Sequence, residues 1–191
     1  MFRSGAIVCF MFIVWLAVVK SEKCPNVNPV PNFNITALTG TWFEVARYKE
    51  DTIEKTANGT NITLSFVKKD LTYTMSSFVG NKLHTIHGTI TPAPEAKGKG
   101  IIIYTMETED GTHLPNIYIY VLAIDYHKYL ILYDCIYNEK TKKATELVWI
   151  SVRDPHVHKY IEDAINSFVN ANHLINLDKL VWERPSDHIY A

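Results

Sequence analysis

The stretch Gly40-Thr41-Trp42-Phe43-Glu44-Val45-Ala46-Arg47-Tyr48, taken with Val148-Trp149-Ile150-Ser151-Val152-Arg153 far along the chain, decides the fold. Both stretches have the residues of β-strands. Trp42 near the start of the first strand and Arg153 at the end of the last can meet only if the sheet between them curls round and closes on itself. The guanidinium can then lie on the indole face, a cation–π contact that stabilises by ~0.5–2 kcal/mol. The pair therefore predicts a closed barrel, whose interior can hold a ligand.

The chain between these stretches has the pattern of an all-β protein. Segments rich in Val, Ile, Thr, Tyr and Phe alternate with turn-forming residues. A helix is expected after the last strand, over residues 155–170, with Asp154 as its N-cap. Its apolar stripe packs outside the sheet. The stripe contains Val157, Ile161, Ala164, Ile165 and Phe168; the expected strands are 42–48, 60–67, 71–78, 82–91, 100–106, 117–124, 129–137 and 144–152, with a short ninth at 179–182.

The N-terminal residues 1–21 have the pattern of a secretory signal peptide. Arg3 gives a positive start, and the apolar run 6–19 is shorter than the ~20 residues that span a bilayer. Cleavage is expected before Glu22, which leaves residues 22–191 as a single domain in the extracellular space. An uncleaved membrane anchor is the alternative. Stable membrane insertion of the mature domain is not expected, because no second apolar run of this length follows.

Cysteine and sequon usage agrees with secretion. Cleavage removes Cys9, and in an oxidising compartment Cys24 and Cys135 are expected to form one disulfide, with two free thiols as the alternative. Sequons at Asn34, Asn58 and Asn61 predict N-glycosylation at the surface, although the last two are too close for both to be dependably occupied.

The charge distribution argues against nucleic acid as a partner. The net charge is −1, and Lys and Glu are interspersed along the chain. Nucleic-acid binding needs a basic face or stripe, which this sequence lacks.

Three separated motifs and an N-terminal arm resemble the lipocalin family, and within it the insect branch of bilin-binding proteins, insecticyanins and apolipoprotein D relatives. The arm is Cys24-Pro25-Asn26-Val27-Asn28-Pro29-Val30 with Asn32-Phe33, and the stretch 40–48 matches the first motif. Asp125-Tyr126 stands at the second motif, where Ile124 departs from the expected residue, and Arg153 fits the third. The resemblance implies an eight-stranded antiparallel up-and-down β-barrel with one C-terminal α-helix packed on its outside.

One departure from the family pattern concerns the first loop of the barrel. Relatives often carry a second disulfide from this loop to the C-terminal tail, and this chain has no cysteine at either place. Asn58 and Asn61 are expected in that loop instead, beside the cavity mouth.

The three motifs are expected to converge at the closed end of the barrel. We interpret them as a structural floor rather than as ligand contacts. The floor residues are Gly40, Trp42, Asp125, Tyr126 and Arg153.

Strand alternation then divides the barrel walls. A disulfide to an arm outside the barrel directs Cys135 outward, and the outer set, including Phe43 and Val45, receives the helix. The inward set suits an elongated amphipathic guest such as a fatty acid, retinoid, sterol, other lipid or bilin pigment. Alternation and the resemblance to lipocalins together imply the following cavity residues: Glu44, Tyr48, His84, Ile86, Tyr104, Met106, Ile117, Ile119, Val121, Leu130, Leu132, Asp134, Ile136, Thr145, Leu147 and Trp149.

The sequence favours binding over catalysis. With both cysteines in a disulfide no thiolate is available, and no nucleophile-elbow spacing occurs. No metal site or cofactor is expected, because His84 and His87 face opposite sides of one strand; a haem held by His84 is the alternative. A different class stays open: a secreted interaction or lipid-antioxidant protein with a vestigial cavity, in which Met106 acts as a reductant. A receptor or a second copy of the chain also stays open as a partner.

Overall fold

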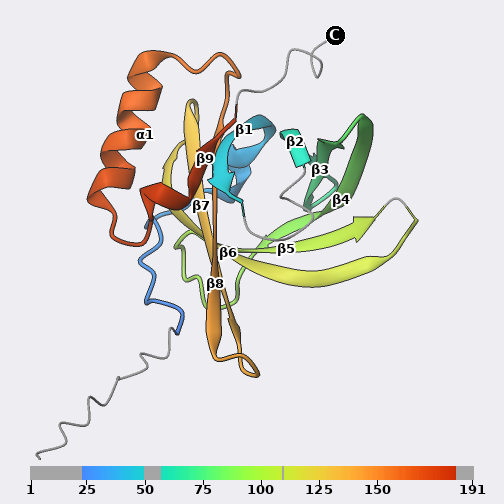
Figure 1. Ribbon diagram of the computed structural model, residues 1–191. Helices are drawn as coiled ribbons and strands as arrows, with labels where there is room; N and C mark the ends of the chain where they lie inside the picture. Colours follow the sequence, from blue (N-terminus) through green and yellow to red (C-terminus); the bar gives the residue numbers. More distant parts are fainter. Residues whose placement is uncertain (1–22, 50–56, 109, 184–191) are drawn as a thin grey trace, which may run out of the picture.

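The computed structural model describes residues 23–49, 57–108 and 110–183. The expected signal segment lies outside these residues. The described chain forms an antiparallel sheet that closes on itself, one α-helix and two short 3-10 helices (Figure 1). The strands are β1 (Gly40–Tyr48), β2 (Ala57–Val67), β3 (Asp70–Val79), β4 (Lys82–Pro92), β5 (Ile101–Thr108), β6 (His113–Asp125), β7 (Tyr129–Asn138), β8 (Lys143–Val152) and β9 (Leu180–Trp182).

The sheet closes because its first strand pairs at both edges. β1 to β8 pair in sequence order, β8 pairs back onto β1, and β1 also pairs with β2. Toward the mouth, Ala46 to Tyr48 of β1 pair with β9. The predicted eight-stranded up-and-down barrel is therefore confirmed, and each strand lies within a few residues of its expected range.

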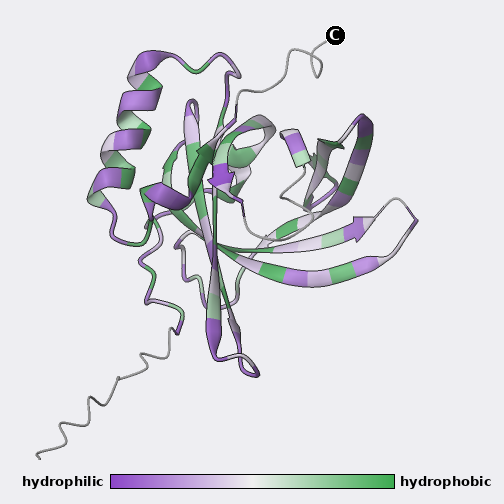
Figure 2. Ribbon diagram, in the orientation of Figure 1, coloured by the Kyte–Doolittle hydropathy of each residue, from purple (hydrophilic) through white to green (hydrophobic). Residues whose placement is uncertain are grey.

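The helix α1 (Lys159–Ala171) packs against the outside of the barrel, as predicted (Figure 1). Its buried residues are Ile161, Ile165 and Val169, and its apolar face is turned toward the sheet (Figure 2). Two details of the prediction were wrong. The helix begins at Lys159, because Asp154 accepts a hydrogen bond from His156 N in a turn instead of capping a helix. Ala164 is exposed, and Val169 takes its place in the stripe.

Two separate apolar cores result from the alternation of the strands. The outer core lies between the barrel and α1 and includes Val45, Ile131, Ile150 and Ile165. The inner core lies inside the barrel. Its buried members are Leu38, Trp42, Leu64, Leu71, Tyr73, Ile90, Ile102, Tyr104, Ile119, Val121, Leu130 and Leu132.

The predicted disulfide is confirmed between Cys24 and Cys135, which are 111 residues apart in the chain with Cα atoms 5.6 Å apart. Cys135 packs with the outer core, so the N-terminal arm is fastened to the outside of β7. The arm continues to the floor, where Val30 N donates a hydrogen bond to Val121 O and Gly100 N donates to Val30 O.

The placement of two sequons in the first loop was wrong. Asn58 and Asn61 lie in β2, which begins at Ala57. The pairing of β2 with β3 shifts between these two residues, and Gly59 has a φ of 62°, so an irregular strand replaces the expected loop. Asn34 and Asn58 are exposed, whereas Asn61 is partly buried.

Candidate functional site

The floor of the barrel brings four of the five expected floor residues into contact. The Arg153 guanidinium lies 3.6 Å from the centroid of the Trp42 ring. Arg153 also donates hydrogen bonds to the carbonyls of Tyr126 and Thr41. A Cβ at Gly40, whose φ is +96°, would lie 3.0 Å from Arg153 Nη1. These contacts seal the closed end through backbone atoms and leave little for a ligand to bind.

The fifth floor residue, Asp125, shapes the turn between β6 and β7. Its carboxylate accepts a hydrogen bond from His127 N and pairs with Lys128 at 3.0 Å. The side chain therefore holds the turn against the floor.

A small pocket lies inside the barrel just above the floor. Its volume is about 10 Å³, roughly the space of one water molecule. The pocket is lined by Leu38, Trp42, Ile62, Leu64, Tyr104, Leu130, Leu132 and Ser151. The lower lumen is therefore closely packed.

The inner apolar wall changes in exposure from floor to mouth. Near the floor, Leu71 and Ile90 face each other across β3 and β4 and are buried. Toward the mouth, their counterparts Met75 and Ile86 are only partly buried. The same holds across β5 and β6, where Met106 and Ile117 are partly buried. Apolar surface thus stays accessible in the upper lumen.

Most of the expected cavity residues lie on this inner face. Tyr104, Ile119, Val121, Leu130 and Leu132 are buried in the inner core. Met106, Ile117 and Trp149 pack against that core with part of their surface exposed. Glu44 and Asp134 are buried charged residues on the same face, opposite Ser151 and Leu147.

The placement of Tyr48 in the cavity was wrong, because its side chain points away from the lumen. The pairing of β1 with β8 shifts between Glu44 and Ala46, which marks a β-bulge. The extra residue reverses the alternation, so Arg47 points inward and Tyr48 joins the outer core. There the Tyr48 hydroxyl accepts a hydrogen bond from Asn176 N.

We predict that Tyr48→Phe lowers the free energy of unfolding by about 1 kcal/mol, because the partly buried hydrogen bond from Asn176 N to the tyrosine hydroxyl is lost. Ligand affinity is expected to stay unchanged, since the hydroxyl lies outside the barrel. Urea denaturation and a ligand titration of the variant check both statements. Weaker ligand binding with unchanged stability would place Tyr48 in the cavity after all.

Three other expected cavity residues lie at exposed ends of strands. His84 is exposed near the β3–β4 turn. Ile136 and Thr145 face each other on the β7–β8 hairpin and are both exposed. This hairpin extends beyond the barrel wall (Figure 1). Side chains on its inward face therefore lie outside the cavity, although alternation had predicted them inside.

A buried charged cluster on the inner side of β1 was not predicted from the sequence. Arg47 Nη1 lies 3.0 Å from Glu44 Oε1, and Arg47 Nη2 donates to Ala57 O and lies 3.5 Å from Glu183 Oε1. Lys49 also pairs with Glu183, at 2.8 Å. Two cations and two carboxylates neutralise one another here. The bulge that turns Arg47 inward leaves no mark in the residue pattern.

Other missed residues could have been found by alternation. Ile62 and Leu64 on β2 and Leu71, Tyr73 and Met75 on β3 follow a strict period of two. Leu38 had no such signal, because it reaches the inner core from the 3-10 helix η1 (Ile35–Leu38).

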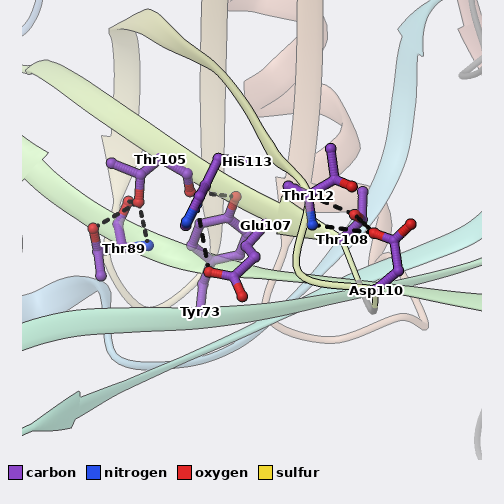
Figure 3. A network of polar contacts seen from close by, with 8 residues as sticks. All are labelled: Tyr73, Thr89, Thr105, Glu107, Thr108, Asp110, Thr112 and His113. Atoms are coloured by element: carbon purple, nitrogen blue, oxygen red, sulfur yellow. Dashed lines mark hydrogen bonds and ion pairs between the residues drawn. The ribbon is translucent and has the colours of Figure 1, made fainter.

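Two tyrosines form an aromatic pair inside the barrel. The rings of Tyr73 and Tyr104 have centroids 5.1 Å apart. Burial raises the pKa of both phenols, so their hydroxyls stay protonated at physiological pH. The Tyr73 hydroxyl donates to Thr105 O at 3.0 Å (Figure 3). Gly88 makes this contact possible, since a Cβ there would lie 1.8 Å from Thr105 O.

The rim at β5 and β6 is held by polar contacts (Figure 3). The Thr108 hydroxyl donates to Asp110 Oδ1 at 2.5 Å, and Thr112 N donates to the same oxygen at 3.1 Å. These hydrogen bonds lower the pKa of Asp110. His113 lies 3.5 Å from Glu107 across the same hairpin. These contacts join the mouth-side ends of β5 and β6.

Asp134 on β7 is buried, and no charged group in the described part of the chain pairs with it. Its Oδ1 accepts a hydrogen bond from Cys135 N at 2.7 Å, while its Oδ2 is buried and has no hydrogen-bond partner. Burial raises the pKa of this carboxyl. A carboxyl whose pKa is higher in the folded state costs stability as the pH rises from its unfolded pKa through its folded pKa.

Asp134→Asn is therefore expected to raise the free energy of unfolding near pH 7 by an amount on the order of 1 kcal/mol, and with it the unfolding temperature. The difference from the unmodified protein should shrink below the unfolded pKa of about 3.9, where both side chains are neutral. Thermal unfolding at pH 3 and pH 7 measures both values. A variant that is less stable at pH 7 would show that the carboxylate is paired and stabilising.

The family model for the lipocalin / cytosolic fatty-acid binding protein family matches residues 39–185. The chain is a lipocalin. Insecticyanin-A of Manduca sexta is 29% identical over 165 residues, covering 83% of this lipocalin and 84% of that protein. The bilin-binding protein of Pieris brassicae is 29% identical over 171 residues, covering 89% of this lipocalin and 88% of that protein.

A solved structure agrees with the fold of this lipocalin. Insecticyanin from the tobacco hornworm Manduca sexta has a TM-score of 0.79 at 25% identity, covering 87% of this chain and 88% of that one. These relatives place the lipocalin in the insect branch, as the sequence motifs predicted. None of the helices in residues 23–49, 57–108 and 110–183 is long and apolar enough to span a membrane.

Proposed function

We propose that this lipocalin is a secreted carrier of a small hydrophobic molecule, such as a lipid, fatty acid, retinoid, sterol or bilin pigment. The observation that carries the proposal is the inner apolar wall, which is separate from the outer core, buried at the floor and partly exposed toward the mouth. A protein that needed only a stable barrel would gain by burying this wall. Accessible apolar surface with a few polar groups suits a ligand site.

The upper lumen is the proposed place of the ligand. The pocket at the floor, with about 10 Å³, holds no more than a water molecule, whereas small-molecule sites measure roughly 300–1,000 Å³. The ligand would therefore rest above Leu132 and contact Met75, Met106, Ile117 and Trp149.

Two further observations support the proposal. The name of the Pieris brassicae relative states that it binds a bilin, so a pigment is among the guests to test first. The disulfide between Cys24 and Cys135 suits an oxidising, extracellular compartment and leaves neither sulfur as a thiolate, which favours carriage over thiol catalysis.

Tryptophan fluorescence of the purified protein, titrated with palmitate, retinol and biliverdin, tests the proposal. At least one of the three is expected to quench the fluorescence saturably at one molecule per chain. Ile117→Trp should weaken that binding by about tenfold or more, because a larger side chain fills the upper lumen. Tyr118→Trp is the matched control, because the next residue of β6 points outward and is exposed.

If the protein binds none of the three guests, the carrier function is contradicted. That result would favour the alternative class, a secreted interaction protein with a vestigial cavity. Equal effects of the two tryptophan variants would contradict the location of the site in the upper lumen.

A further inference from the structure

Three acidic or basic side chains of the described residues lie buried on the inner wall of the barrel: Glu44, Arg47 and Asp134. The first two form an ion pair at 3.0 Å, and Glu183 and Lys49 complete a balanced cluster around them. No salt bridge within 4.0 Å reaches Asp134 in the described part of the chain. Among the described residues, Asp134 is therefore a buried carboxyl with no salt-bridge partner.

The orientation of Asp134 follows from its neighbours on β7. The Tyr133 hydroxyl donates to Glu146 on the outer face, and Cys135 bonds the outer arm. Asp134, between them, points to the inner face and is 4% exposed. Its Oδ2 has no hydrogen-bond partner, although a buried acceptor left unpaired costs stability.

The height of Asp134 in the barrel is set by strand register. Leu132, which lines the floor pocket, pairs with Trp149, and Asp134 pairs with Leu147 two residues nearer the mouth. The free oxygen thus lies just above the packed floor, at the level where the inner wall becomes partly exposed. A ligand in the upper lumen would come within reach of it.

We propose that Asp134 is the recognition residue for an N–H group of the ligand, and that the ligand is an apolar scaffold that carries such a donor partway along its length. This inference rests on the proposed carrier function. An N–H donor satisfies the unpaired oxygen, and a polarised or cationic donor also offsets its charge. A guest whose carboxylate enters this level is disfavoured, because two like charges would face each other in a low dielectric.

Two classes of ligand carry such an N–H donor. A tetrapyrrole presents neutral pyrrole N–H groups, and an aromatic amine presents a cationic ammonium. Asparagine at position 134 separates them, because it keeps an acceptor oxygen and loses the charge. Leucine removes both, and it matches the neighbouring inner residues Leu130 and Leu132.

The test is isothermal titration calorimetry of the full protein and its variants with biliverdin, tryptamine and retinyl acetate. Of these three ligands, retinyl acetate has no N–H or O–H donor. Asp134→Leu is expected to weaken at least one N–H ligand by about tenfold or more and to leave retinyl acetate within about twofold. Asp134→Asn should weaken tryptamine by a similar factor and biliverdin by only about threefold. Asp163→Asn is the control, because it makes the same change on the outer face of α1, where Asp163 pairs with Lys159.

The outcomes separate this inference from the carrier function. If the unmodified protein binds retinyl acetate but neither N–H ligand, or if Asp134→Leu leaves N–H binding unchanged, the recognition role is wrong and carriage stands. An equal loss for all three ligands in both Asp134 variants would make Asp134 a part of the wall rather than a recognition group. If the unmodified protein binds none of the three, both the carrier function and this inference are contradicted.

Discussion

Trp42→Ala is expected to lower the free energy of unfolding by about 3–5 kcal/mol. Trp42 is 1% exposed and closes the floor pocket from below. Its indole N–H donates to Leu38 O at 2.9 Å, and its ring receives the Arg153 guanidinium. Alanine leaves a cavity, removes one of the two hydrogen bonds that Leu38 O accepts, and deprives the Arg153 guanidinium of its aromatic partner.

Urea denaturation followed by far-UV circular dichroism measures this loss without relying on the deleted fluorophore. Trp182→Ala is the matched control, because Trp182 is 41% exposed on β9 and should cost less than about 1 kcal/mol. An unfolding midpoint for Trp42→Ala that equals that of the unmodified protein would show that the floor does not depend on this plug.

Cys135→Ser is expected to have the second large effect. The Cys24–Cys135 bond closes a loop with a sequence separation of 111 residues. In the chain-entropy treatment, such a cross-link stabilises by ~4–5 kcal/mol, and strain in the native state makes the value smaller. The N-terminal arm would also lose its covalent attachment to β7.

Three variants isolate the contribution of the disulfide. Cys135→Ser, Cys24→Ser and the double variant should lose the same stability, because each removes the same bond. Thiol titration of the unmodified protein should find neither Cys24 nor Cys135 free. Finding both Cys24 and Cys135 as free thiols, or additive losses in the double variant, would contradict the disulfide.

Strand alternation made most of the barrel predictable from sequence. Runs such as Leu71, Tyr73 and Met75 keep a strict period of two, so their face could be assigned once the barrel was inferred. The Trp42–Arg153 contact was predictable for the same reason, since only a closed sheet brings the two ends together. The position of α1 followed from its apolar stripe.

The errors arose where local backbone geometry overrides a pattern. The β-bulge after Glu44 adds one residue to β1, which sends Arg47 inward and Tyr48 outward. Asp154 forms a turn with His156 rather than a helix cap, so α1 starts later than Pro155 suggested. Neither event changes the residue types in a way that a periodicity argument detects.

The buried charges show a second limit of the sequence. Glu44 and Asp134 are both carboxylates on the inner face, yet one is paired with Arg47 and the other has an unpaired oxygen. That difference depends on three-dimensional placement, and it separates a structural ion pair from a candidate recognition group.

Native mass spectrometry of the protein purified from its own organism, with organic extraction and an absorption spectrum, tests whether this lipocalin carries a small hydrophobic molecule. We expect one small hydrophobic molecule per chain, with an absorption band in the visible range if the guest is a pigment. A protein that arrives empty, and whose fluorescence fatty acid, retinoid and bilin all fail to quench, would contradict carriage.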